Sequence, residues 1–89
     1  MSVYVDNMYA SYRRMKLCHM FADSTDELND MADKIGVNRK WIQDANTYRE
    51  HYDVAKISRK RAIDAGAIEI NMHELGQLLR EKKTLAKEK

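Results

Sequence analysis

Three short segments of the 89-residue chain carry aspartate and histidine residues where strands or helices are expected to end. They contribute Asp6, His19 and the tripeptide His51-Tyr52-Asp53. An aspartate beside a histidine can fix its tautomer, raise its basicity or share a metal ion with it. We therefore expect Asp6, His19, His51 and Asp53 to act as acid and base or to bind a divalent metal ion.

A contact between Asp6 and His19 requires a particular pairing of two strands. The apolar stretches Val3–Asp6 and Leu17–Ala22 are candidate strands, and an antiparallel pairing would place the end of the first beside the start of the second. The alternative is that Asp6 only ends its strand and accepts hydrogen bonds from turn amides. The contact also depends on whether Leu17–Ala22 is a strand or a short helix, which its length does not decide.

The tripeptide His51-Tyr52-Asp53 suggests one wall of a site. In an extended segment His51 and Asp53 point to the same side, whereas Tyr52, a candidate substrate contact, packs the other way. Asp53 precedes a predicted helix at Ala55–Ala65, whose first N–H groups could bind a phosphate. The alternative is an ordinary aspartate at a helix start beside a partly buried histidine. A shared site requires the Asp and His side chains to lie within ~4–6 Å of one another.

Asp23 and Cys18 have structural interpretations that we prefer. On a helix, His19 and Asp23 would share one face and could bind a metal together, whereas along a strand they would lie ~13 Å apart, too far to share one ion. The position of Asp23 before a helix favours the helix dipole. Cys18 would point away from His19 into the core. A single cysteine with three histidines excludes a structural zinc finger and favours a reducing compartment.

Basic residues gather in two places and could form a phosphate-binding surface with Lys60 or Arg61 as the direct ligands. The usual meaning of such a run is a solvated helix face. The net charge of +2 is too small to indicate nucleic-acid binding by itself, and three separated glycines form no phosphate loop. The basic residues are Arg13, Arg14 and Lys16 in the first half, and Lys56, Arg59, Lys60 and Arg61 in the predicted second helix.

Composition indicates one small folded domain that positions these residues. The chain is 44% apolar and 34% charged, which is typical of a globular protein. No apolar run approaches the ~20 residues of a membrane helix, and the first residues do not resemble a signal peptide. We expect a cytoplasmic protein that is not associated with a membrane.

The first helix has the clearest sequence signals. Ser24-Thr25-Asp26-Glu27 is a capping box, in which the Ser24 hydroxyl binds the Glu27 N–H and the Glu27 carboxylate reaches back to the Ser24 N–H. Gly36 is suited to end the helix because it accepts a positive φ. The apolar residues that share one face of this helix are Leu28, Met31, Ala32 and Ile35.

The remaining segments complete a β-β-α-β-α-β-α order. It predicts an α/β fold in residues 1–80, a small mixed sheet covered by three helices, with its first two strands antiparallel and parallel pairing in the second half. The charged residues 81–89 are expected to be a frayed or disordered tail. The other predicted segments are a loop at Met8–Lys16, a strand at Val37 and Trp41–Gln43, a loop at Asp44–Glu50, a strand at Ala67–Ile70, and a helix capped by Asn71–Glu74.

A set of motifs spread to about Leu79 resembles one family. Those motifs are Val3–Asp6, His19–Ser24, Glu27-Leu28, Ala32, Gly36, His51–Val54, Arg61 and Gly66-Ala67. Together they resemble domain of unknown function 4031, a family of small bacterial and bacteriophage proteins. The resemblance implies a cytosolic bacterial or phage protein and supplies no activity. It implies that Asp6, His19, Asp23, Glu27 and the His-Tyr-Asp tripeptide are the polar positions on which the family pattern centres.

Three functions remain open from the sequence, and the first two are of different classes. The first is a metal-dependent or His/Asp-dependent hydrolase that acts on a phosphoester of a nucleotide or nucleic acid. The second is a non-catalytic phage accessory module that binds a host protein or an RNA through its basic helix. A plain structural subunit is a third, and a homodimer would suit a core of this modest size.

Overall fold

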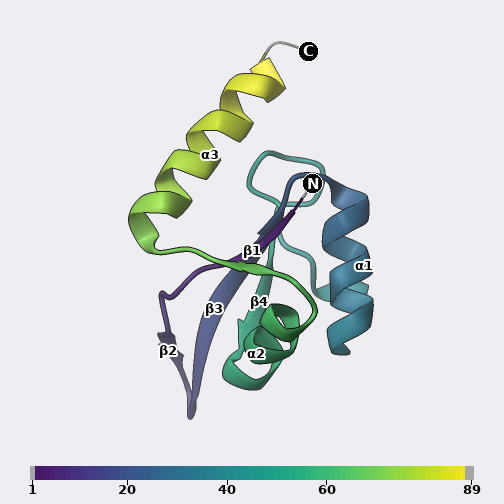
Figure 1. Ribbon diagram of the computed structural model, residues 1–89, viewed down its shortest axis with the longest axis vertical. Coiled ribbons are helices and arrows are strands. Elements are labelled where there is room, and N and C mark those ends of the chain that lie inside the picture. Colours follow the sequence, from purple (N-terminus) through teal and green to yellow (C-terminus); the bar gives the residue numbers. More distant parts are fainter. Residues whose placement is uncertain (1, 88–89) are drawn as a thin grey trace.

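The computed structural model describes residues 2–87 and has the predicted α/β fold (Figure 1). Among these residues, five strands form one mixed sheet, and three α-helices and a short 3₁₀ helix accompany it. The strands are β1 (Val3–Val5), β2 (Ala10–Tyr12), β3 (Met15–Ala22), β4 (Tyr52–Ala55) and β5 (Ile68–Glu69). The helices are α1 (Thr25–Ile35), η1 (Arg39–Trp41), α2 (Lys56–Asp64) and α3 (Met72–Lys87).

Strand β3 is the centre of the sheet, which confirms that Leu17–Ala22 is extended. Leu17 pairs with Ala10 of β2 on one edge and with Ala55 of β4 on the other, all antiparallel. Strand β1 pairs antiparallel with the other end of β3, in the predicted sense. Strand β5 lies parallel to β1, whereas β4 pairs antiparallel with β3, so the parallel pair joins the two ends of the chain and does not lie within its second half as predicted.

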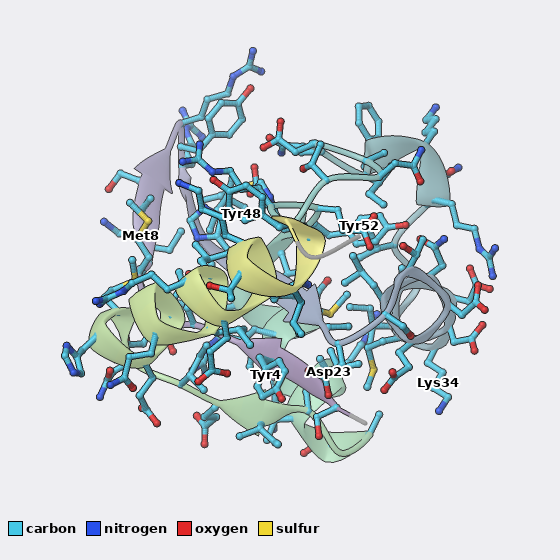
Figure 2. All side chains as sticks on the ribbon, turned by 90° about the horizontal axis from the view of Figure 1, so that it is seen from above. Tyr4, Met8, Asp23, Lys34, Tyr48 and Tyr52 are labelled. Carbon is cyan, nitrogen blue, oxygen red and sulfur yellow. The ribbon has the colours of Figure 1, made fainter. Side chains whose placement is uncertain are left out.

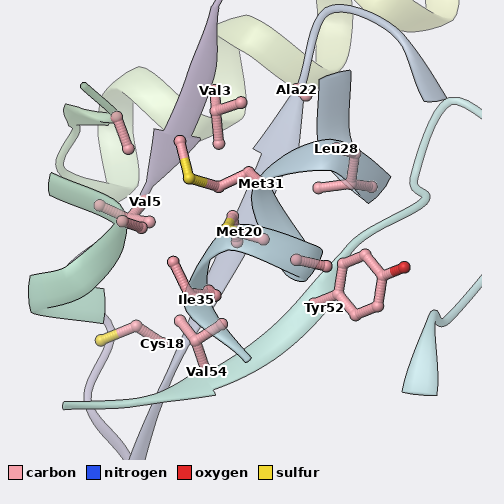
Figure 3. Packing of buried hydrophobic residues seen from close by; sticks show 13 residues of the cluster. Val3, Val5, Cys18, Met20, Ala22, Leu28, Met31, Ile35, Tyr52 and Val54 are labelled. Atoms are coloured by element: carbon pink, nitrogen blue, oxygen red, sulfur yellow. The ribbon is translucent and has the colours of Figure 1, made fainter. Parts of the chain in front are cut away.

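The two faces of the sheet support different helices. Figure 2 shows α1 and α3 on opposite sides of the sheet. The larger core lies between the sheet and α1 with α2, and Figure 3 shows Met20, Tyr52 and Val54 packed there against Leu28 and Ile35. A smaller cluster on the other face joins Phe21 to residues of α3 and the segment before it. Because strand side chains alternate, β3 sends Cys18 and Met20 to the larger core and His19 and Phe21 to the α3 side.

Helix α1 begins and ends as its sequence predicts. The Ser24 hydroxyl accepts a hydrogen bond from the Glu27 N–H at 3.2 Å and donates one to the Glu27 carboxylate at 2.8 Å. This last bond replaces the predicted one from the Ser24 N–H. Gly36 ends the helix with a φ of 80°, a conformation that side-chain-bearing residues rarely adopt. The predicted apolar face, Leu28, Met31, Ala32 and Ile35, is buried.

Replacing Ser24 with alanine is expected to destabilise the protein by about 1 kcal/mol, because the Glu27 N–H loses its cap. For a domain of this size the melting temperature should fall by roughly 4–8 °C, which thermal unfolding followed by circular dichroism would show. Ser24→Thr keeps a capping hydroxyl and serves as the matched control. Equal melting temperatures for the alanine and threonine variants would contradict a stabilising role for the cap.

Two segments differ from their predicted conformations. The Met8–Lys16 segment predicted as a loop contains β2, which forms a hairpin with β3 through a turn at Arg13 with a φ of 56°. The strand predicted at Trp41–Gln43 is wrong. A 3₁₀ turn forms there, and the Asn38 side chain caps it by accepting a hydrogen bond from the Lys40 N–H. The Trp41 side chain is 63% exposed and does not pack into the core as a strand residue would.

The boundaries of the last two helices also differ from the prediction. Asp53 lies within β4, and α2 begins at Lys56, one residue later than predicted, so the phosphate site expected at this helix start stays a prediction. Helix α3 continues to Lys87 through residues predicted as a frayed tail, which are mostly good helix formers. The Lys82 ammonium also donates to the Ala22 carbonyl, and residues 88–89 of that tail lie outside the described residues. Within residues 2–87, no helix combines the length and apolarity needed to cross a bilayer.

Candidate metal centre

The pairing of β1, β3 and β4 brings three of the candidate side chains to one face of the sheet. Asp6 follows β1 and its N–H donates to the His19 carbonyl at 3.0 Å, which continues the antiparallel ladder by one residue. On the other edge of β3, His19 pairs with Asp53. Side chains opposite each other in a ladder share a face, so Asp6, His19 and Asp53 lie side by side. The predicted Asp6–His19 contact is therefore confirmed.

His51 joins this group from the residue before β4. It forms an isolated antiparallel bridge with Gln43, with Gln43 N–H to His51 carbonyl at 2.9 Å and the reverse bond at 3.1 Å. Its ring lies edge-on to the His19 ring at 5.2 Å between centroids and also 5.2 Å from the buried Phe21 ring. Phe21 thus supports both histidines from the apolar side.

Three ligand atoms converge at this point. The Nε2 atoms of His19 and His51 lie 3.8 and 3.6 Å from Asp53 Oδ1, and one ligand atom from each residue falls within 4.8 Å of the others. In a tetrahedral zinc site with bonds of ~2.0–2.1 Å, ligand atoms are roughly 3.3 Å apart. The two distances to Asp53 Oδ1 therefore exceed this spacing by only a few tenths of an ångström. We call His19, His51 and Asp53 the metal triad.

The partners of the two Nδ1 atoms determine which ring nitrogens can bind a metal. His19 Nδ1 lies 2.6 Å from Asp6 Oδ2, and His51 Nδ1 lies 2.7 Å from the Arg49 carbonyl oxygen. A carboxylate and a carbonyl only accept, so each Nδ1 carries its hydrogen and donates. In the neutral rings the free lone pair is then on Nε2, the atom that faces Asp53. Metal-binding histidines in proteins are held by this kind of hydrogen bond.

Asp53 is oriented in the same way. Its Oδ2 accepts a hydrogen bond from the Gln43 side-chain amide at 2.6 Å, which leaves Oδ1 directed at the two histidines. Sequence reasoning did not select Gln43, because its role follows from the bridge to His51, eight residues away in the chain. The Arg49 carbonyl was missed for a similar reason, since backbone acceptors carry no residue-type signal.

Asp6 lies behind His19 and does not belong to the metal triad. Its side chain is fully buried, and its Oδ1 accepts from the N–H groups of His19 and Met8 at 2.9 and 3.2 Å. Burial raises the pKa of Asp6, but the hydrogen bonds from the His19 ring and from the two N–H groups lower it by more, so the net pKa falls below 3.8. The bond to Asp6 in turn raises the pKa of His19 above 6.5, against the smaller opposing effect of burial. Asp6 is therefore a positioning residue for His19.

The predicted substrate contacts do not lie beside the metal triad. Tyr52 points into the larger core, where its hydroxyl donates to Asn29 Oδ1 at 2.6 Å (Figure 3). Lys60 is on α2, which packs on the opposite face of the sheet, and the exposed Arg61 is on the same helix. These residues therefore cannot hold a phosphate directly over the metal triad.

Cys18 keeps the structural role preferred from the sequence, and Asp23 has a structural role that differs from the predicted one at the helix dipole. The Asp23 carboxylate accepts from the Ser2 N–H at 2.8 Å and the Tyr4 hydroxyl at 3.0 Å, which ties the start of β1 to the end of β3. Cys18 is buried in the larger core, and this burial raises the pKa of its thiol. A buried thiol with a raised pKa is a poor nucleophile.

Two nitrogens and one oxygen around a partly exposed point are a ligand set that reactive metal sites in other proteins use. The His19, His51 and Asp53 side chains are 26, 13 and 34% exposed, so solvent reaches the triad. Catalytic zinc sites use three protein ligands and leave a further position for water, and two histidines with one carboxylate also bind iron. Imidazole ligands favour these transition metals over Mg²⁺.

Comparison with known proteins identifies a family and no activity. Neither the curated proteins nor the solved structures include one that matches the chain. The family model described as protein of unknown function DUF4031 matches residues 3–82, which include every residue of the metal triad and its supporting contacts. The chain therefore belongs to the DUF4031 family.

Proposed function

We propose that this protein is a divalent-metal-dependent hydrolase that acts on a phosphoester of a nucleotide or nucleic acid. The observation that carries the proposal is the convergence of one ligand atom each from His19, His51 and Asp53 to within 4.8 Å of one another, while the Nδ1 of each histidine is engaged elsewhere. When both rings are neutral, the two ring lone pairs and the Asp53 carboxylate repel one another unless a cation lies among them. A first-row transition metal such as Zn²⁺ is the cation that suits this ligand set.

Each supporting contact has a defined part in this function. A divalent metal ion held by His19, His51 and Asp53 would supply a nucleophile at neutral pH, because it would lower the pKa of a water molecule to ~7. Asp6 and the Arg49 carbonyl keep the two Nε2 lone pairs available, and Gln43 fixes the Asp53 carboxylate. Phe21 closes the apolar side, so the reacting groups approach from solvent.

A candidate cation for a phosphoester is Arg49, which lies two residues before His51 in the chain. Its carbonyl holds His51, and its exposed guanidinium lies 5.5 Å from the centre of the Tyr48 ring. An arginine stacked on an aromatic ring keeps its planar donors free for two oxygens of a phosphate. In this proposal Arg49 takes the role that the sequence suggested for Lys60 or Arg61.

The test is hydrolysis of bis-p-nitrophenyl phosphate by chelator-treated protein supplied with Zn²⁺, Mn²⁺ or Mg²⁺. We expect hydrolysis that depends on a transition metal and falls by at least ~100-fold in Asp53→Ala, because the triad loses its carboxylate. The control is Asp64→Ala, which removes an exposed aspartate at the end of α2.

The results separate the metal site from the reaction. Equal hydrolysis by Asp53→Ala and wild type would show that the measured activity does not come from the triad. Metal binding without hydrolysis of this diester, of p-nitrophenyl phosphate or of a nucleotide panel would overturn the hydrolase and leave a metal-binding domain. Hydrolysis of p-nitrophenyl acetate alone would replace the phosphoester with a carboxylic ester.

A further inference from the structure

A second concave site lies between the β2–β3 hairpin and α2. Its volume is about 460 Å³, within the range of ~300–1,000 Å³ found for small-molecule sites. Lys16 on β3 lies on the same side of the sheet as Cys18, and α2 packs on that side, so this site faces away from the metal triad. The residues that line it are Tyr9, Lys16, Lys56, Arg59, Lys60 and Ile63, and we call it the basic pocket.

Four of the six lining residues are cations, and none is acidic. The α2 residues lie at positions i, i+3, i+4 and i+7, which is one face of a helix, and the hairpin adds Lys16 from the other wall. None of the three lysines has a carboxylate oxygen within 4.0 Å among the described residues. Positive charges gathered in a concavity raise the local potential and attract an anion.

Arg59 gives this pocket a fixed charged wall. It is only 8% exposed, and its Nε donates to the Asp6 carbonyl oxygen at 2.8 Å. One terminal nitrogen lies 3.3 Å from Glu69, which is 60% exposed and so offsets the charge weakly. Because the guanidinium is held by the backbone of a buried residue, its direction does not depend on a ligand. Such preorganisation is what distinguishes a binding site from a loose group of surface lysines.

Tyr9 and Ile63 supply the apolar part of the same pocket. The Tyr9 ring has Lys56 Nζ 5.8 Å and the Arg59 guanidinium 5.2 Å from its centre, so the cations lie directly beside an aromatic surface. A ligand that matches both parts has a phosphate group joined to a flat apolar group. A nucleoside monophosphate has this chemistry.

We propose that the basic pocket binds the phosphate group of a mononucleotide, on the opposite face of the sheet from the metal triad. The pocket is a site separate from the proposed hydrolase centre, and its ligand contacts none of the metal ligands. Arg59 links the two faces, because the Asp6 carbonyl that it binds belongs to the residue whose carboxylate holds His19.

The test is calorimetric titration of chelator-treated protein with AMP, with adenosine and with inorganic phosphate. The test variant is Lys56→Glu with Lys60→Glu, and the control is Lys40→Glu with Lys83→Glu, which makes the same charge change at exposed lysines outside the pocket. Glutamate at position 56 lies in the first turn of α2, where an acidic residue favours the helix dipole, so the test variant should fold.

We expect AMP to bind wild type and the control with similar Kd, and the test variant at least ~10-fold more weakly, because charge-assisted bonds to the phosphate are lost. Adenosine should bind much more weakly than AMP. Inorganic phosphate that binds as tightly as AMP would support the pocket and assign it to the phosphate group alone. Equal AMP binding by the test variant and the control, equal binding of adenosine, or no binding of any of the three would overturn the proposal. Metal-free protein is used, so failure of the hydrolase does not affect the result.

Discussion

His51→Ala is expected to abolish the stabilisation of the protein by Zn²⁺. A metal ion at 100 times its Kd should stabilise the metal-free wild type by ~2.7 kcal/mol, which for a domain of this size raises the melting temperature by roughly 10 °C or more. The alanine variant keeps only His19 and Asp53 as ligands, and two ligands do not retain an ion as three do. Thermal unfolding of chelator-treated protein, with and without added metal, measures both shifts.

The control is His73→Ala, which removes an exposed histidine near the start of α3. It should keep the full metal-induced shift. The shift is compared, and not the melting temperature itself, because the His51 ring also packs against Phe21 and its loss destabilises the metal-free protein. A full shift in His51→Ala would contradict its place in the metal triad. A lost shift in His73→Ala would assign the metal to another site.

Asp6→Asn is expected to weaken metal binding ~10–100-fold while the protein stays folded. Asparagine has the same shape, and its Oδ1 can still accept from the His19 and Met8 N–H groups. Its amide nitrogen, however, replaces the Oδ2 that accepts from His19 Nδ1. An amide there donates, so His19 must accept on Nδ1 and carry its hydrogen on Nε2. The lone pair that faces Asp53 is then lost.

The tautomer of His19 gives this prediction a signature that a general loss of stability would not produce. Nitrogen-15 NMR of the imidazole rings should show His19 with its hydrogen on Nδ1 in the wild type and on Nε2 in Asp6→Asn. His51 is an internal control, because its Nδ1 donates to the Arg49 carbonyl in both proteins. Unchanged metal affinity in a variant with the altered His19 tautomer would show that His19 is not a ligand.

We expect the loss of stability caused by Asp6→Asn to depend on pH in chelator-treated protein. The pKa of Asp6 is lower in the folded protein than its ordinary value of 3.8. Ionised Asp6 therefore adds to the free energy of unfolding above pH 3.8, and this contribution is lost as the pH falls through the folded pKa. The pKa of His19 is higher in the folded protein than its ordinary value of 6.5. Protonated His19 therefore adds fully to the free energy of unfolding below pH 6.5, and this contribution is lost as the pH rises through the folded pKa. The difference in unfolding free energy between wild type and Asp6→Asn should therefore be largest between these two pH values. Urea titrations across this range measure it, and a difference independent of pH would contradict the charged pair.

Several features followed from short stretches of sequence because their causes are local. The capping serine, the apolar face and Gly36 of α1 are spaced by helix geometry alone, and the structure confirms each. The placement of His51 and Asp53 on one side of an extended segment depends only on the alternation of a strand. The Asp6–His19 contact needed one further assumption, an antiparallel pair with a short connection, and the pairing of β1 with β3 confirms it.

The features that the sequence did not predict have non-local causes. Strand β2 is stabilised by its partner β3, while its own residues are mostly exposed and show no strand pattern. Gln43 reaches Asp53 only because a loop returns the chain to form the Gln43–His51 bridge. The backbone carbonyl that holds His51 could belong to any residue type.

By itself, the sequence determined that Asp6, His19, His51 and Asp53 are available to one site, since strand periodicity sets the direction of each side chain relative to its neighbours. Only the tertiary structure decided how the polar residues divide among roles. The register of β3 against β1 and β4 leaves three of them as a metal triad and Asp6 buried behind His19. The packing of α2 on the other face sends Lys60 into a pocket of its own. Residues on opposite faces of a sheet cannot share a site, and packing across the whole chain fixes which face each helix covers.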